Sequence, residues 1–166
     1  MTGWSLRQSK GAALAVSALA SIARVALGVL WLKEGLLKYH AHFGAPDIGL
    51  VVNSASSNSR VSPLFRWFTT HILGSWPGLF GAVVPLVETA LGLVLILGVL
   101  PRLAALVSSL QLCFYWSADQ LVAQYPIMAA LSALVLVLGP VSHPFSIVTL
   151  VRAGRQHIHR RGRLVT

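Results

Sequence analysis

Two charged side chains, Arg24 and Glu88, lie inside long apolar stretches of the sequence. A charged residue at the centre of a membrane span costs about 2.5–3.5 kcal/mol, so each needs a partner, water or, for the carboxyl, a proton. We expect Arg24 and Glu88 to form a buried polar pair. The pair either fixes the register of two helices or is a functional centre, in which Glu88 takes up a proton or both groups bind the polar head of a lipid-soluble substrate such as a quinone.

The remaining candidates for chemistry are few. His40 and His42 form an HxH pair, and His71 follows in the same connection, so these three are weak candidates for a metal site. No acid or cysteine is clearly placed to complete that site, and we expect no metal. The single cysteine, Cys113, excludes a disulfide framework and a CxxC redox pair. Because no histidine lies in the middle of an apolar stretch, a bis-histidine haem is not expected either, and the chain has no expected cofactor of its own.

The composition is that of a membrane protein. Hydrophobic residues make up 55% of the chain and charged residues 10%, whereas a soluble domain carries about 25% charged residues. The apolar residues form long runs separated by short polar stretches, which is typical of segments that lie in lipid. The net charge of +9 does not indicate nucleic-acid binding, because the basic residues lie at the chain ends and loop edges.

We predict an all-α fold, in which residues 1–166 form a single membrane domain built as an integral membrane four-helix bundle. A helix needs about 20 apolar residues to cross a hydrocarbon layer of about 30 Å. Glycines such as Gly28, Gly35 and Gly92 indicate close contacts between the helices. The predicted spans are residues 15–37, 79–100, 103–118 and 122–139.

The predicted outer loop, residues 38–78, is the one long connection. Its middle, residues 53–59, is too polar to lie in lipid and should face water. Ser62, Pro63 and Gly74 mark the start and end of a short helix, which we expect to lie flat on the outer membrane surface. This interfacial helix is either a docked lid without a ligand of its own or a gate over a lateral opening.

The distribution of basic residues predicts the orientation. Short basic segments resist translocation, so they remain in the cytoplasm. Eight basic residues fall on one side, namely Arg7, Lys10, Arg102 and five arginines of the tail 152–166, against four on the other. We therefore expect both termini in the cytoplasm, with the basic tail in contact with anionic membrane lipid.

Several short motifs follow one another along residues 20 to 140, and together they resemble the DoxX/DoxD family of small four-span bacterial membrane proteins. The motifs are Arg24-x3-Gly28 through Gly35-x2-Lys38, then Val84-Pro85-Leu86-Val87-Glu88-x3-Gly92, then Leu97-Gly98 to Arg102-x-Ala104-Ala105, and finally Gly139-Pro140.

This resemblance implies a protein of the bacterial cytoplasmic (inner) membrane in a redox setting. DoxD is a subunit of a thiosulfate:quinone oxidoreductase, and DoxX-like proteins are associated with oxidative-stress and sulfur metabolism complexes. We therefore expect a subunit of a quinone-linked membrane complex, with Arg24 and Glu88 at its polar centre. If the chain is part of an enzyme, that enzyme is a quinone-linked oxidoreductase whose electrons come from a partner.

Two other functions stay open. The chain could be a non-catalytic accessory or scaffold subunit that binds a larger membrane complex through its outer helix and basic tail, or a small-molecule carrier that uses the same polar centre. The expected partners are membrane lipid and other membrane or redox subunits. A homo-oligomer is compatible with the sequence, whereas nucleic acid is not an expected partner.

Overall fold

The computed structural model describes residues 3–139, and its side chains from residue 11 onward. The predicted basic tail lies outside the described residues, as does Pro140 of the last motif. Within the described part the chain is helical and has no strand, which confirms the all-α class. The elements are α1 (Gly3–His40), α2 (Ala45–Ser57), α3 (Pro63–Phe68), the π-helix η1 (Thr69–Leu73), α4 (Pro77–Leu97), α5 (Pro101–Ser117) and α6 (Tyr125–Leu138).

Two of these helices are long and apolar enough to cross a membrane. They are α1, over Gly11–His40, and α4. The other two predicted spans correspond to shorter helices, α5 with 17 residues and the apolar α6 with 14. α6 begins three residues later than the predicted span because residues 118–124 form the turn that follows α5.

The outward faces of all four helices carry large apolar side chains, which suits a surface in contact with lipid. Examples with more than half of the side chain exposed are Ile22 and Val29 on α1, Leu79 and Leu86 on α4, Leu103 and Leu110 on α5, and Ile127 and Val137 on α6.

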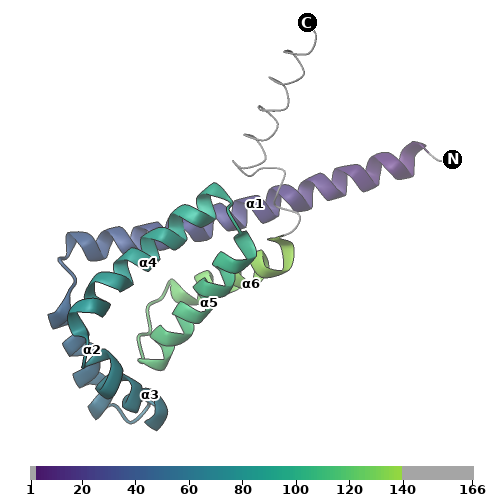
Figure 1. The fold of residues 1–166 in the computed structure, drawn as a ribbon. Coiled ribbons are helices and arrows are strands. Elements are labelled where there is room, and N and C mark those ends of the chain that lie inside the picture. The colour runs from purple at the N-terminus through teal and green to yellow at the C-terminus, as the bar shows by residue number, and fades with distance from the viewer. Residues whose placement is uncertain (1–2, 140–166) are drawn as a thin grey trace, which may run out of the picture.

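α1 and α4 lie side by side along much of their length (Figure 1). Their backbones touch at glycines, as predicted. A Cβ atom added to Gly92 would lie 2.6 Å from the backbone nitrogen of Leu32, and one added to Gly28 would lie 2.9 Å from the carbonyl oxygen of Gly92. Gly35 packs in the same way against Thr89, whose backbone nitrogen would lie 2.8 Å from an added Cβ. These contacts fix the antiparallel register of the two helices.

α1 also packs against α5 and α6 through a buried series of hydrogen bonds. Trp31 Nε1 donates to Ser108 Oγ at 2.7 Å, and the hydroxyls of Ser108 and Ser132 are also 2.7 Å apart. Ser132 Oγ then donates to the carbonyl of Met128 at 2.7 Å. These polar groups are fully buried. The series of hydrogen bonds therefore joins three helices and specifies a register that apolar packing alone would leave undefined.

The link between α4 and α5 is short because each helix has a specific end signal. Gly98 adopts φ = 72°, the left-handed conformation that ends many helices, and the N–H of Val99 returns to the carbonyl of Val94 at 3.0 Å. Pro101 occupies the first position of α5, where its missing N–H leaves no hydrogen bond unmade. The predicted span 79–100 thus ends three residues earlier than expected, at Leu97.

The long connection contains more structure than the sequence analysis predicted. The short helix starting at Ser62 is confirmed as α3 and η1, and Ser62 Oγ accepts the N–H of Phe65 at 3.2 Å. α2, however, was not predicted, because the serine-rich stretch 53–59 was interpreted as a water-facing loop. Gly44 is the N-cap residue of α2, and its N–H donates to Asp47 Oδ2 at 2.8 Å. The last turn of α2 includes exposed polar residues of the stretch 53–59.

α2, α3 and η1, residues 45–73, lie together at the end of the bundle farthest from the N-terminus (Figure 1), and we call them the lid. Where the chain enters the lid, Gly81 of α4 contacts the backbone of Gly44. A Cβ on Gly81 would lie 2.6 Å from the carbonyl carbon of Gly44. The entry to the lid is therefore held against α4 by main-chain atoms.

The glycine contact predicts a sharp difference between two substitutions on α4. Gly92→Ala forces the backbones of α1 and α4 apart, and we expect it to destabilise the protein by about 1–3 kcal/mol, as overpacking does. Gly78→Ala is the matched control, because an added Cβ there meets no atom within 4 Å. Thermal unfolding of the detergent-solubilised variants, followed by circular dichroism, measures both. Equal unfolding temperatures for the two variants would refute the contact.

Candidate functional site

Glu88 lies fully buried on α4 and binds side chains from two other helices. Its Oε1 atom accepts hydrogen bonds from Lys38 Nζ at 2.8 Å and from the hydroxyl of Tyr115. Lys38 of α1 also contacts Glu34 Oε2 at 3.2 Å, so one ammonium group bridges two carboxyl groups. The burial expected for Glu88 is confirmed.

Arg24 is also buried, but it does not pair with Glu88. Its Nη1 atom donates to the carbonyl oxygens of Leu95 and Ile96, with 3.0 Å to Ile96. Carbonyls in the last turn of a helix lack partners within the helix and carry partial negative charge, so a guanidinium group satisfies them. Leu95 is seven residues, about 10 Å, beyond Glu88 along α4. The predicted Arg24 to Glu88 contact is therefore wrong.

Lys38 is the partner that the sequence analysis missed, because it was assigned to the outer loop 38–78 and counted only among the basic residues that predict the orientation. The positions of the glycines indicate the register that would have identified Lys38. Gly28 packs against Gly92, and Gly35 packs against Thr89. This antiparallel register places the turn that holds Glu34 and Lys38, rather than Arg24, opposite Glu88.

A continuous polar network surrounds this centre. Gln124, just before α6, donates through Nε2 to Glu34 Oε1. At the other end, Gln111 Nε2 donates to the hydroxyl of Tyr115 at 3.0 Å. Lys38 Nζ lies 5.5 Å from the centroid of the Tyr115 ring, within the range of a cation–π contact. The network therefore joins α1, α4 and α5 to the residue that precedes α6.

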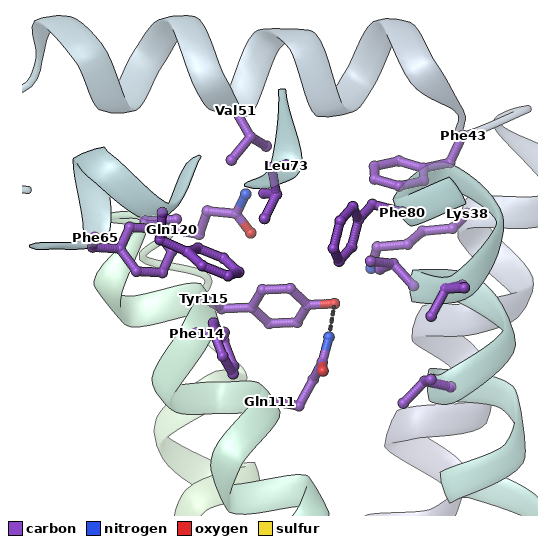
Figure 2. A pocket seen from close by; sticks show the side chains of 15 residues that line it. Lys38, Phe43, Val51, Phe65, Leu73, Phe80, Gln111, Phe114, Tyr115 and Gln120 are labelled. Atoms are coloured by element: carbon purple, nitrogen blue, oxygen red, sulfur yellow. Dashed lines mark hydrogen bonds between the residues drawn. The ribbon is translucent and has the colours of Figure 1, made fainter. Parts of the chain in front are cut away.

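The polar centre borders a cavity of about 210 Å³ between the lid and the bundle (Figure 2). Figure 2 shows the Tyr115 ring projecting into this space, with Lys38 on the side of its hydroxyl group. The polar lining residues are Lys38, Gln111, Tyr115 and Gln120. The rest of the lining is apolar and includes five phenylalanines, namely Phe43, Phe65, Phe68, Phe80 and Phe114.

Aromatic and ionic contacts hold the lid over the cavity. Phe65 and Phe68 of α3 pack against Phe114 of α5, with ring centroids 6.3 and 5.6 Å apart. Beyond them, Asn58 Nδ2 and Arg60 Nη2 each donate to Asp119 Oδ2 at 2.7 Å. We call this pair of hydrogen bonds the Asp119 contact.

The pKa of the Asp119 carboxyl lies below its usual value, because first the hydrogen bond from Asn58 and then the contact with Arg60 favour the ionised form. The Asp119 contact is therefore complete at neutral pH. It is lost as the pH falls through the lowered pKa, because protonation removes the charge that Arg60 binds.

The three histidines considered for a metal do not form a site in the described part of the chain. There, no three His, Cys, Asp or Glu side chains come together as metal ligands. His71 instead stacks on Trp67, with ring centroids 5.2 Å apart, and its Nδ1 lies 2.9 Å from the carbonyl oxygen of Trp67. His40 and His42 are exposed near the end of α1.

The chain matches a known protein family. A family model described as DoxX matches residues 19–120, which confirms the resemblance noted from the motifs. The matched segment includes Glu34, Lys38, Glu88 and Tyr115, together with every residue that lines the cavity. No curated protein and no solved structure matches the chain.

The Asp119 contact predicts that Asp119→Asn loosens the lid without changing the bundle. We expect amide hydrogen exchange at neutral pH to accelerate by up to about fivefold in residues 45–73, because exposed ion pairs contribute modestly, and to remain unchanged in α1 and α4. Arg60→Gln should reproduce this effect. Ser59→Ala, at the exposed neighbouring position, is the control. Exchange in the lid that does not respond to either substitution would show that Phe65, Phe68 and Phe114 suffice to hold it.

Proposed function

The chain belongs to the DoxX family, and from that membership and the cavity we propose that it is a multi-pass protein of the bacterial cytoplasmic membrane that binds the ring of a lipid-soluble quinone in the cavity beside Lys38 and Tyr115. The observation that carries the proposal is a mainly apolar, aromatic-lined cavity with a lysine at its edge. Sites for small ligands combine such apolar walls with a few polar groups that orient the ligand.

In this proposal α1, α4, α5 and α6 cross the membrane, and both termini are cytoplasmic. The outward apolar side chains on all four helices support this arrangement. The lid then lies at the outer surface. Exposed Leu64, Trp67 and Trp76, with 78%, 55% and 64% of their surface accessible, suit a position among lipid head groups.

The size of the cavity favours a single ring. Drug-sized ligands occupy about 300–1,000 Å³, whereas this cavity has about 210 Å³. One substituted ring fits such a volume, and a prenyl tail must extend outside it. The rings of Phe114 and Tyr115 offer faces and edges for stacking on the quinone.

The polar groups at the cavity favour a ligand that accepts hydrogen bonds. A lysine ammonium group has three donors, and Glu34 and Glu88 take two of those of Lys38. The third can donate to a quinone carbonyl. Reduction of that quinone to the quinol needs two electrons and two protons. In this proposal the electrons come from a redox partner subunit of a thiosulfate:quinone oxidoreductase-like complex and the protons from solvent.

An accessory role is the second candidate, and exposed apolar side chains of the lid and of the residue that caps α4 favour it. Leu64, Trp67 and Trp76 would bind a larger membrane complex if they do not lie among lipid head groups. Purification in mild detergent, followed by mass spectrometry, separates the two functions. Retained quinone or a dehydrogenase supports the redox role, whereas a complex that stays active after deletion of this subunit supports the accessory role.

Filling the cavity tests the quinone proposal. Val84→Trp places an indole among the lining residues, and we expect it to weaken binding of decylubiquinone at least tenfold, as measured by equilibrium dialysis of the purified protein in mixed micelles. Leu86→Trp is the matched control on the outward face of α4, where the side chain is 58% exposed. Binding by Val84→Trp that equals that of the wild type would exclude this cavity as the quinone site.

A further inference from the structure

Glu34, Lys38 and Glu88 carry unbalanced charge within the protein. Lys38 Nζ lies 2.8 Å from Glu88 Oε1 and 3.2 Å from Glu34 Oε2, and the exposed fractions of the Glu34, Lys38 and Glu88 side chains are 13%, 17% and 0%. With all three groups ionised, one ammonium faces two carboxylates and the net charge is −1. A net charge withdrawn from water is costly unless another charge or a proton neutralises it.

Among the residues that the structure describes, the neighbouring elements place no second cation in contact with this group. From α5, the hydroxyl of Tyr115 donates to Glu88, and Tyr125 of α6 stacks on Tyr115 with ring centroids 5.2 Å apart. Both phenols are uncharged donors. Arg24 contacts carbonyls about 10 Å further along α4, while Gln124 approaches Glu34 with a neutral amide.

The two carboxyl oxygens of Glu88 differ in their contacts, and the difference indicates which oxygen can carry a proton. Lys38 and Tyr115 both donate to Oε1, whereas Oε2 is buried and has no hydrogen-bond partner among the described residues. In a carboxylate, Oε2 would carry about half of the negative charge without a donor from the described residues to stabilise it. A proton on Oε2 removes this charge and leaves both hydrogen bonds to Oε1 intact.

We propose that Glu34, Lys38 and Glu88 form a proton-binding site that holds one exchangeable proton at neutral pH, carried on Oε2 of Glu88. The partly exposed Glu34 connects the site to water, because Lys38 can give a proton to Oε1 of Glu88 and take one from Glu34. Rotation of the Glu88 carboxyl group then brings the protonated oxygen to the Oε2 position. Lys38 and Tyr115 also line the cavity, so the proton lies directly behind the groups that would contact a ligand. The site follows from the charges and contacts of this chain and does not depend on which ligand the cavity takes.

Infrared spectroscopy can count this proton without any ligand, since the whole chain contains only four aspartates and glutamates. For the purified protein in lipid nanodiscs at pH 7, we expect the absorption of one protonated carboxyl group, which shifts in D₂O. Glu34→Gln and Glu88→Gln should each abolish this band, because the remaining carboxylate then balances Lys38. Lys38→Met should double the band, because both carboxyls must then be protonated.

Asp119→Asn is the matched control, because it removes an acid outside the site and should leave the band unchanged. A wild-type protein without the band, or with a band that does not shift in D₂O, overturns the proposal. A band that persists in Glu34→Gln also overturns the proposal. This variant provides the test if Glu88→Gln fails to fold, because Glu34 lies at the partly exposed edge of the site and glutamine keeps hydrogen-bonding groups there. Loss of quinone binding in the dialysis experiment would not change these results, so failures of the two proposals are distinguishable.

Discussion

The direct backbone contact between α1 and α4 determines where every polar group of the interior lies. Gly28, Gly35 and Gly92 have no side chains to separate the two helices, so the register is set by main-chain atoms that cannot rearrange. That register brings Lys38 to Glu88 and brings Arg24 to the carbonyl end of α4. The positions of the charges are therefore set by the packing of α1 on α4. Arg24 and Glu88 each contact a partner on the other helix of this pair.

The sequence was sufficient for the parts of the fold that depend on composition. Long apolar runs predicted the four bundle helices, and the cost of burying charge correctly predicted that Arg24 and Glu88 would lie inside. Their partners could not be deduced from hydropathy, because a carbonyl group at a helix end is present in every sequence and Lys38 resembles any charge that ends a span. Only the register separates these possibilities, and it depends on which glycines face each other.

The lid shows a second limit of sequence analysis. Asn53, Ser54, Ser56 and Ser57 are residues common in loops, yet they form the end of α2, because their exposed side chains can hydrogen-bond to the preceding turn or to water. The cavity was equally hidden, since Phe43, Phe65 and Phe114 come from segments far apart in the chain. Their convergence depends on how α2 packs on α4 and α3 packs on α5, which no local sequence pattern predicts.

The lid is attached differently to α4 and to α5. At Gly44 the chain is pressed against Gly81 of α4 by main-chain atoms, whereas the contacts with α5 and the turn after it are made by side chains, Phe65 and Phe68 on Phe114 and Asn58 and Arg60 on Asp119. Side-chain contacts can be exchanged for water, while a close backbone contact cannot. A movement of the lid away from α5 would therefore break side-chain contacts alone and leave the backbone contact at Gly44 in place.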